Sequence, residues 1–343
     1  MEPEQSVQPD SPLAQIVTIL SLAPIPNADK IELATVLGWE VVVQKSEFNV
    51  GDLAIYFSIG SILPTSNPNT AFLEGKVLKT RKIRRVLSQG LLGSISWLAS
   101  FGVTTAVAEG DNVTDLLGVR KWVATEEMSL YESASGCGGP FPQLIPKTDE
   151  PRVQNCPKRL RELENQPVVI TQKYDGTSYT ILAYDGKVLV CNRNNIVAPD
   201  SNTPYAEITK RYNLIEKLTQ LGKNLAIQGE IIGPKINGNR HKVPDKELFV
   251  FNIYDANAHT YMSWDAVLAL TTQLGLKTVP VVYRGIMKPD WLTVPALLEL
   301  SSSQLYDTGV IAEGIVVKSD YGVGGPRTSF KVISNKYLLK YDL

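Results

Sequence analysis

The chain has 343 residues, 43% of them hydrophobic and 20% charged, with a net charge of −1. This length allows two domains, and this composition is that of an ordinary globular protein. The balanced charge excludes nucleic-acid binding through the overall charge of the molecule, so such binding requires a local patch. No apolar run reaches the roughly 18 residues of a membrane span, and we expect no membrane partner.

Two further features of the composition restrict location and chemistry. Residues 1–12 are acidic and contain proline, which excludes a secretory signal and predicts a short disordered tail. The three cysteines, Cys137, Cys156 and Cys191, are odd in number and widely spaced, which favours a reducing cytoplasm. With two histidines in the whole chain, a histidine-based metal site or triad is not expected.

Residues 13–120 are predicted to form a small β-barrel of the OB type. Runs rich in β-branched and aromatic residues at 16–23, 31–44 and 52–59 alternate with turn residues. A basic segment follows and is expected to be one strand of this barrel, presented to a nucleic-acid backbone. A charged edge strand that prevents aggregation is the structural alternative. The six basic residues of this segment are Lys76, Lys79, Arg81, Lys82, Arg84 and Arg85.

Residues 121–150 are expected to link this domain to a second one that spans residues 151–343. The linker is rich in glycine and proline, but residues 140–146 are too apolar for a free linker and should pack on one of the domains. Strands dominate the second domain, which predicts an α+β fold of antiparallel sheets flanked by helices. Helices are predicted over 152–165, 206–222, 263–275 and 293–306, with Ser263 as an N-cap and Gly222 and Gly275 at C-termini.

Lys173 is the strongest candidate for a catalytic residue. It follows the apolar run 168–170 and precedes Asp175 and Gly176. A lysine at the end of a buried strand suits a covalent nucleophile, provided that burial or a nearby cation lowers its pKa. Asp175 is suited to hold a hydrated metal ion, and Gly176 allows a sharp turn close to a nucleotide. The alternative is an ordinary hairpin turn, which we assign to the similar segment 184–187.

Polar side chains stand at the ends of several later strands. Taken singly, each has an ordinary structural explanation as a strand-end charge, a core aromatic residue or an edge lysine. Phe249 and Phe251 alternate on one face of their strand. The other residues of this group are Arg193, Glu230, Glu313, Lys318 and Lys331.

Together these segments resemble a known set of motifs. KYDG, GEIIG, FVFNIYD, EGIVVK and SFKVIS are similar, in this order, to motifs I, III, IIIa, IV and V of the covalent nucleotidyltransferases. That superfamily contains DNA ligases, RNA ligases and mRNA capping enzymes. The chain looks most similar to ATP-dependent RNA ligases with an N-terminal OB domain, the RNA ligase 5 family. IPKTDEPRVQN and SFKVISNKYLLKYD, with PNADKIELATV and VLSQGLL in the first domain, extend the resemblance from residue 13 to the end.

The resemblance implies a role for each matching residue. Lys173 attacks the α-phosphate of ATP and becomes a lysine–AMP adduct, while Lys318 and Lys331 neutralise that phosphate. Asp175, Glu230 and Glu313 bind Mg²⁺ or Mn²⁺ with its water shell, and Glu230 can also contact the ribose. Phe251 stacks on adenine, and Gly176 lies in the turn of the first motif. Arg193 holds the ribose or a phosphate, and Arg152 engages the nucleotide or the RNA end.

Two positions depart from the usual pattern of the family. Gln172 precedes the nucleophile where many relatives have glutamate, and its amide oxygen can accept a hydrogen bond from the adenine amino group. Ile333 replaces the second lysine of motif V, which leaves Lys331 as the main candidate and Lys336 as a weaker one.

The resemblance therefore predicts a monomeric RNA ligase that adenylylates a 5′-phosphate end and seals it to an RNA 3′-hydroxyl. Its substrate would be RNA or a nicked RNA-containing duplex. DNA ligases and capping enzymes, the nearest alternatives, usually carry an OB domain after motif V, whereas twelve residues follow Lys331 here. A non-catalytic RNA- or tRNA-binding protein is the alternative from another class, since the first domain also resembles tRNA-binding OB modules.

Overall fold

The computed structural model describes residues 12–122, 137–198, 202–320 and 327–341. The predicted disordered tail therefore lies outside the described residues, except for Pro12. Two compact units divide the chain. The first contains residues 1–123, 154–156 and 338–343, and the second contains residues 124–153 and 157–337. We describe each unit by itself.

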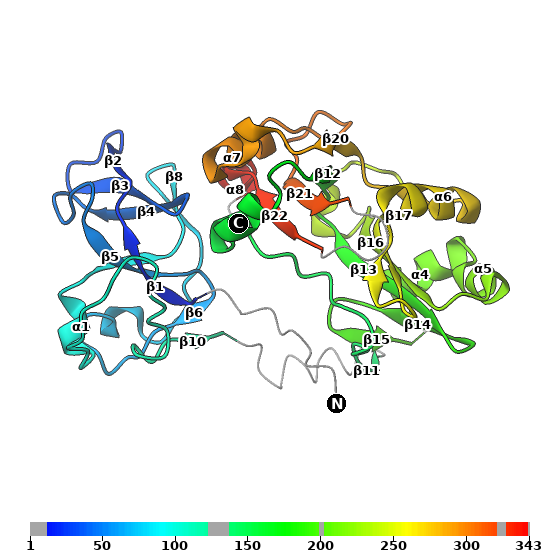
Figure 1. Cartoon of the computed structure of the whole chain (residues 1–343), viewed down its shortest axis with the longest axis horizontal. Helices are drawn as coiled ribbons and strands as arrows, with labels where there is room; N and C mark the ends of the chain where they lie inside the picture. The colour runs from blue at the N-terminus through cyan, green and yellow to red at the C-terminus, as the bar shows by residue number, and fades with distance from the viewer. Residues whose placement is uncertain (1–11, 123–136, 199–201, 321–326, 342–343) are drawn as a thin grey trace. The chain divides into compact units, whose positions relative to one another are not determined.

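The first unit is built from short antiparallel strands (Figure 1). Strand β5 lies between β1 and β9, and β3 lies between β2 and β4. Both faces of β5 are covered, because Ala54 and Tyr56 belong to one hydrophobic cluster while Ile55 and Phe57 belong to another. The elements are β1 (Ala14–Thr18), β2 (Ser21–Pro24), β3 (Ile31–Val36), β4 (Trp39–Gln44), β5 (Leu53–Phe57), β6 (Ser61–Ile62), β7 (Arg81–Ile83), β8 (Val86–Ser88), β9 (Leu91–Ser94), α1 (Trp97–Ser100) and β10 (Arg120–Lys121).

The basic segment is not one strand, so this part of the prediction was wrong. Strand β7 ends at Ile83 and β8 begins at Val86, and the two strands pair as an antiparallel hairpin. Arg84 and Arg85 form its two-residue turn with φ of 50° and 71°, the left-handed values of a type I′ turn. The six basic side chains therefore do not lie along a single strand, although all six are exposed.

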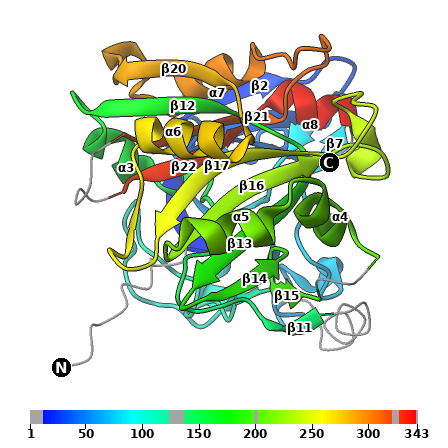
Figure 2. The same ribbon diagram turned by 90° about the vertical axis from the view of Figure 1, so that its right-hand side faces the viewer.

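The described residues of the second unit form two sheets, antiparallel except for the short pairing of β19 with β17 (Figure 2). The larger sheet has the order β11-β15-β14-β13-β16-β17-β18, with the short β19 beside β17. The smaller sheet has the order β20-β12-β21-β22. Its inner strand β12 carries Val168, Val169 and Ile170, which are at most 3% exposed. The strands are β11 (Cys137–Pro140), β12 (Pro167–Lys173), β13 (Thr177–Tyr184), β14 (Lys187–Cys191), β15 (Asn195–Val197), β16 (Leu225–Ile232), β17 (Glu247–Asp255), β18 (Thr260–Tyr261), β19 (Lys277–Thr278), β20 (Val281–Ile286), β21 (Gly314–Ser319) and β22 (Ser329–Ile333).

Helices pack against these sheets and begin and end where capping residues allow. The side chain of Ser263 accepts a hydrogen bond from the Ala266 N–H at the start of α6, and Gly275 ends that helix in a left-handed conformation, as predicted. The predicted helix over 206–222 is two helices separated at Asn213, and the last one predicted ends at Ser302 instead of Tyr306. The helices are α3 (Pro157–Glu162), α4 (Pro204–Arg211), α5 (Leu214–Leu221), α6 (Trp264–Leu274), α7 (Val294–Ser302) and α8 (Asn335–Tyr341).

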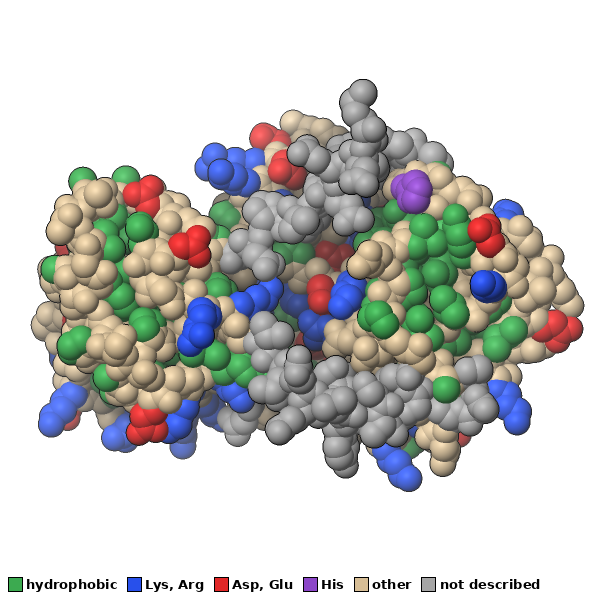
Figure 3. Space-filling model, turned by 90° about the horizontal axis from the view of Figure 1, so that it is seen from below, with side chains coloured by type: hydrophobic (Ala, Val, Ile, Leu, Met, Phe, Trp, Pro, Cys, Tyr) green, Lys and Arg blue, Asp and Glu red, His purple; other side chains and the backbone are tan. Residues whose placement is uncertain are grey.

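These observations confirm the predicted α+β class. Residues 137–150 of the predicted linker belong to the second unit, since β11 pairs with β15 and Phe141 and Ile145 join a hydrophobic cluster with Leu182. Lys121 and Trp122, at its start, belong to the first unit, where Lys121 pairs with Ser61. Residues 123–136 lie outside the described residues. No described helix is long and apolar enough to cross a membrane. Lys and Arg side chains are interspersed with Asp and Glu side chains on the described parts of the face in Figure 3, in agreement with the net charge.

Candidate functional site

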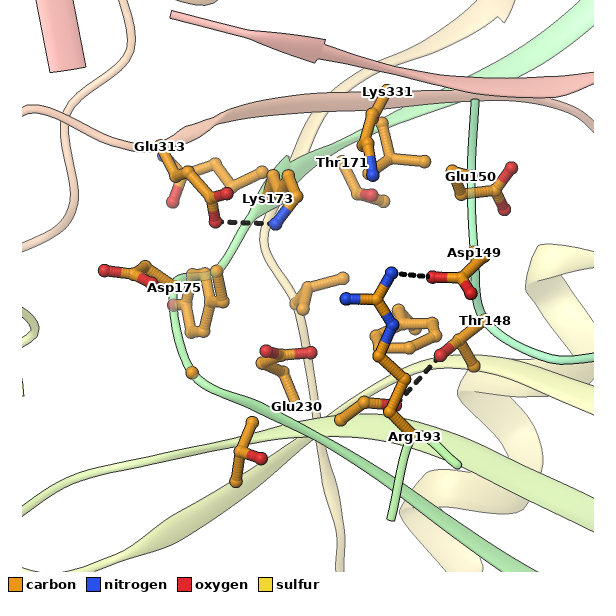
Figure 4. A pocket seen from close by; sticks show the side chains of 18 of the residues that line it. Thr148, Asp149, Glu150, Thr171, Lys173, Asp175, Arg193, Glu230, Glu313 and Lys331 are labelled. Carbon is orange, nitrogen blue, oxygen red and sulfur yellow. Dashed lines mark hydrogen bonds and ion pairs between the residues drawn. The ribbon is translucent and has the colours of Figure 1, made fainter. Parts of the chain in front are cut away.

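A cavity of about 340 Å³ lies between the two sheets of the second unit and collects most of the predicted site residues. This volume is in the range of small-molecule sites. Figure 4 shows Lys173, Glu313 and Lys331 on one side of the cavity and Glu230 and Arg193 on the other. The predicted residues that line it are Gln172, Lys173, Asp175, Gly176, Arg193, Glu230, Phe251, Glu313, Lys318 and Lys331.

Lys173 is the last residue of β12, and its side chain pairs with a carboxylate. The Lys173 Nζ donates a hydrogen bond of 2.6 Å to Glu313 Oε2 (Figure 4). Burial lowers the pKa of Lys173, but the negative charges of Glu313 and Glu230 outweigh burial and hold it above its ordinary value. Lys173 is thus a protonated ammonium group in this arrangement, and added positive charge would be needed to offset the carboxylates and favour the neutral amine.

Two glycines allow the close backbone approaches that bring the motif residues together. A Cβ atom on Gly176 would lie 2.2 Å from the Ile231 carbonyl oxygen, and one on Gly314 would lie 2.1 Å from the Val332 carbonyl oxygen. Neither position accepts a side chain without displacing backbone. The glycine of KYDG therefore brings the turn after Lys173 onto β16, which carries Glu230. The glycine of EGIVVK brings the start of β21 onto β22, which carries Lys331.

Glu230 points into the cavity from β16, next to a bulge in the pairing of β16 with β17 at Gly229. Burial raises the pKa of Glu230 to about 7, against the opposing effect of the Lys173 charge. The bulge explains why glycine occupies position 229, directly before Glu230 on β16. A Cβ atom on Gly229 would lie 2.7 Å from the Phe249 carbonyl oxygen.

Asp175 lines the cavity, but other protein groups bind its carboxylate. Asn237 Nδ2 donates a hydrogen bond of 2.7 Å to Asp175 Oδ1, while the Arg240 guanidinium and the Tyr337 hydroxyl both contact Oδ2. We call Asp175, Asn237, Arg240 and Tyr337 the Asp175 clasp. Within the described ranges, no three acidic, histidine or cysteine side chains are close enough to hold a metal ion together. The structure thus does not assemble Asp175, Glu230 and Glu313 into a set of direct metal ligands.

Lys331 lies on β22 and faces the cavity (Figure 4). Burial lowers the pKa of Lys331 to about 8, and the charges of Lys173 and Arg152 act in the same direction. Arg152 does not line the cavity. It pairs with Lys331 through a parallel backbone bridge, and the Lys331 N–H donates to the Pro151 carbonyl at 2.8 Å.

Lys318 and Phe251 lie together at the end of the cavity. The Lys318 Nζ donates to the Phe251 carbonyl at 2.7 Å and to Asn252 Oδ1 at 3.1 Å. Burial and the charge of Arg327 lower the pKa of Lys318 to about 7. Its ammonium also lies 5.6 Å from the centre of the Phe251 ring, so Lys318 supports the strand and the ring on which a base would stack.

A segment that precedes the nucleophile closes one side of the cavity, and none of its acidic residues was predicted as part of the site. Asp149 Oδ1 accepts from the Arg193 guanidinium at 2.6 Å, and the Thr148 hydroxyl is 2.9 Å from the Ser178 hydroxyl (Figure 4). Glu150 accepts from Arg327 at 2.9 Å. The sequence IPKTDEPR was part of the resemblance, and that was the available signal.

A second group, with Tyr174, His241 and Tyr306 as its unpredicted members, is an aromatic cluster next to Lys173. The Tyr174 ring lies 4.2 Å from the His241 ring and 4.9 Å from the Phe249 ring, and the Tyr306 ring lies 3.9 Å from His241, measured between centroids. Gln172 contacts the loop that carries Tyr306, since its Nε2 donates a hydrogen bond of 2.8 Å to the Leu305 carbonyl. No sequence pattern marked Tyr306 or His241, because each is a single residue in an irregular loop.

Comparison with known proteins gives a consistent result for both units. A family model described as RNA ligase matches residues 166–333, and an OB-fold domain model matches residues 13–95. None of the curated proteins matches the chain.

Solved structures of the RNA ligase from Naegleria gruberi are similar over nearly the whole chain. A lysine-to-alanine variant of that ligase with ATP and Mn is 31% identical, with a TM-score of 0.78. A structure with PPi is 33% identical, with a TM-score of 0.77, and a glutamate-to-alanine variant with AMP and Mn is 32% identical, with a TM-score of 0.79. Each alignment covers 96% of this chain and 98% of the other.

An N-terminal OB domain followed by a domain of antiparallel sheets with helices is therefore the architecture of a two-domain ligase, as predicted. The chain belongs to the RNA ligase family, whose members are ATP-dependent polynucleotide ligases.

Proposed function

We propose that the chain is an RNA ligase of the RNA ligase 5 type that forms a lysine–AMP intermediate on Lys173. One observation carries this proposal: Lys173 lies in a cavity of about 340 Å³ beside two carboxylates, with Lys331 and Arg193 lining the same cavity. Positive charge that neutralises the carboxylates would favour the nucleophilic amine of Lys173, and the cationic side chains would receive the phosphate.

In the first step, the neutral Lys173 amine attacks the α-phosphorus of ATP. The Nζ–P bond forms, the bond from the α-phosphorus to the bridging oxygen breaks, and pyrophosphate leaves. Lys331 neutralises the charge on the α-phosphate oxygens in the transition state, and Arg193 exchanges Asp149 for the ribose or a phosphate. Phe251, held by Lys318, stacks on adenine, and the Gln172 amide oxygen accepts from its amino group.

Glu230 and Glu313 would hold a divalent cation through its water shell, and Asp175 would join them only without its contacts to Asn237, Arg240 and Tyr337. When bound, Mg²⁺ or Mn²⁺ supplies the positive charge that lowers the Lys173 pKa. The pKa of Lys173 supports this assignment, because the carboxylates keep the amine protonated until their charge is offset.

In the second and third steps, a 5′-phosphate oxygen attacks the α-phosphorus of the lysine adduct and breaks the N–P bond. An RNA 3′-hydroxyl then attacks the 5′-phosphorus and releases AMP. Arg152, next to Lys331, is placed for the nucleotide or the RNA end. Equal sealing of all-DNA nicks would contradict the requirement for RNA.

The test is covalent labelling with α-labelled ATP and Mg²⁺ or Mn²⁺, followed by denaturing electrophoresis. We expect acid-labile, base-stable label on the wild-type protein and none on Lys173→Met. Lys187→Met is the matched control, because Lys187 follows the second Tyr-Asp-Gly turn of the chain and should label normally. Full labelling of Lys173→Met would exclude this nucleophile, and labelling by GTP in place of ATP would favour a capping-type reaction.

A further inference from the structure

The Tyr306 hydroxyl lies between the backbones of two site residues. It donates a hydrogen bond of 3.0 Å to the Lys173 carbonyl oxygen and accepts one of 3.0 Å from the Glu313 N–H. The directions are fixed by the partners, because a carbonyl only accepts and an amide N–H only donates. One hydroxyl group therefore joins the backbones of the two residues whose side chains pair at 2.6 Å.

This contact occurs where two paired strands separate. Lys173 opposite Gly314 is the last pair of the β12–β21 ladder, so Glu313 lies just beyond the regular hydrogen bonds between these strands. On its other side, the Glu313 carbonyl accepts from the Ser334 N–H at 2.9 Å. The Tyr306 hydroxyl thus takes the place of a ladder hydrogen bond at the point where ordinary strand pairing no longer sets the separation of Lys173 and Glu313.

The Tyr306 ring is held firmly enough to set that separation. Tyr306 is only 3% exposed. Its ring packs edge-on against the Tyr174 ring, with centroids 5.4 Å apart, and lies tilted against the His241 ring, with centroids 3.9 Å apart. The loop that carries it is closed by hydrogen bonds, since the Tyr306 N–H donates to the Val310 carbonyl at 2.8 Å and the Ala312 N–H donates to the Gln304 carbonyl at 3.1 Å.

We propose that Tyr306 is a positioning residue for lysine adenylylation, whose hydroxyl sets the placement of Lys173 relative to Glu313. This inference rests on the proposed function of Lys173. The plain alternative is that Tyr306 only satisfies two buried backbone groups and contributes to stability. The two possibilities differ because positioning changes the rate of the chemical step, whereas stability alone does not change the rate of the folded protein.

The experiment compares Tyr306→Phe with Tyr179→Phe. Tyr179 is the matched control because it is also fully buried in this unit and its hydroxyl has one side-chain partner, Thr209, at 2.8 Å. Single-turnover adenylylation is measured at saturating ATP on protein shown to be folded by circular dichroism. We expect Tyr306→Phe to be slower by about 10- to 100-fold, with a smaller change in the ATP concentration for half-maximal rate. Tyr179→Phe should adenylylate at the wild-type rate.

A double-mutant cycle with Glu313→Gln separates positioning from other effects. If the hydroxyl acts through the Lys173–Glu313 geometry, removing it from the Glu313→Gln protein should cost much less than removing it from the wild type. If Tyr306→Phe does not fold, the cycle is run with p-aminophenylalanine at position 306, whose amino group donates to the Lys173 carbonyl but accepts poorly from Glu313.

Two results would overturn the inference: a Tyr306→Phe rate equal to that of Tyr179→Phe, or fully additive losses in the cycle. Failure of the proposed function looks different, because the wild-type protein would then carry no label on Lys173.

Discussion

The charged site residues of the second unit and the basic segment of the first unit were both predicted from sequence, but their arrangement in the structure differs. Lys173, Glu230, Glu313 and Lys331 stand 57, 83 and 18 residues apart in the chain, yet all line one cavity. The six basic residues lie within ten positions, yet they are divided over an irregular segment, one short strand and a turn.

This difference shows that the two kinds of sequence pattern, charged residues near glycines and a run of basic residues, determine different properties. In the second unit, each charged residue is tied to a local constraint, such as the glycines at 176, 229 and 314 that permit close backbone approach. Those constraints specify where the backbone places each charged side chain as well as the chemistry that the side chain supplies. In the first unit, a run of lysines and arginines specifies charge alone, because exposed basic side chains are compatible with a strand, a turn or a loop.

The largest effect is expected from the carboxylates beside Lys173. Glu313→Ala and Glu230→Ala should each slow adenylylation by about 100- to 1,000-fold, the usual loss for one preorganised electrostatic group. We expect both variants to stay folded, because burial raises the pKa of the Glu230 carboxyl to about 7, and loss of Glu313 leaves Lys173 with the negative charge of Glu230 nearby. Rapid-quench labelling with ATP, together with thermal unfolding, measures both quantities. Full activity with unchanged metal dependence would make that carboxylate merely structural.

Asp175→Ala should behave differently from these two variants. It removes three hydrogen-bond acceptor contacts of the Asp175 clasp, and hydrogen bonds to charged groups contribute about 1.5–3 kcal/mol. We therefore expect slower adenylylation together with a lower free energy of unfolding. An Asp175→Ala protein as stable as the wild type would show that the clasp contributes nothing to folding.

Most of the fold and much of the site followed from residue patterns. Ser263 and Gly275 mark the ends of α6 through capping, and the motif residues were found through their ordered resemblance to known motifs, because each taken singly has an ordinary structural explanation. Tyr306, Arg240 and Tyr337 were not found, because their roles depend on contacts with residues more than 60 positions away and on no local pattern. The hairpin at Arg84 and Arg85 was missed because arginine rarely occupies left-handed turn positions.

An intermediate effect is expected from the ionisation of Lys331. Its pKa is about 8 in the nucleotide-free protein, so it loses its positive charge as the pH rises through 8. A phosphate binds the charged form more tightly, and affinity should therefore fall above pH 8 by up to about tenfold per pH unit. Glu230, with a pKa of about 7, is ionised over most of this range, and Lys173, with its raised pKa, stays charged.

The measurement is the dissociation constant of α,β-methylene ATP, which Lys173 cannot cleave, between pH 7.5 and 9.5. Lys331→Arg should bind with little pH dependence, because arginine stays charged throughout. Lys336→Arg, on the exposed lysine of the same segment, should keep the wild-type pH dependence. A wild-type affinity that does not change across this range would remove Lys331 from the phosphate site.

The smallest effect is expected from the turn of the basic hairpin. Replacing Arg84 with Asn and Arg85 with Gly removes two exposed charges and supplies the residues that a type I′ turn prefers, so the hairpin should remain folded. If both arginines contact RNA phosphates, the slope of log affinity against log salt should become shallower by about 1.4 to 1.8. Adenylylation should change less, because the proposed nucleotide site lies wholly in the second unit.

Lys76 provides the matched control for this double variant. Its ammonium already pairs with Glu74, so Lys76→Gln should change the salt slope less than the loss of either arginine. Fluorescence anisotropy with nicked RNA at several salt concentrations gives the slopes directly. An unchanged slope in the Arg84→Asn/Arg85→Gly protein would show that charge in this turn does not contact RNA. A loss of adenylylation equal to the loss of RNA affinity would instead show that the basic hairpin takes part in the first chemical step.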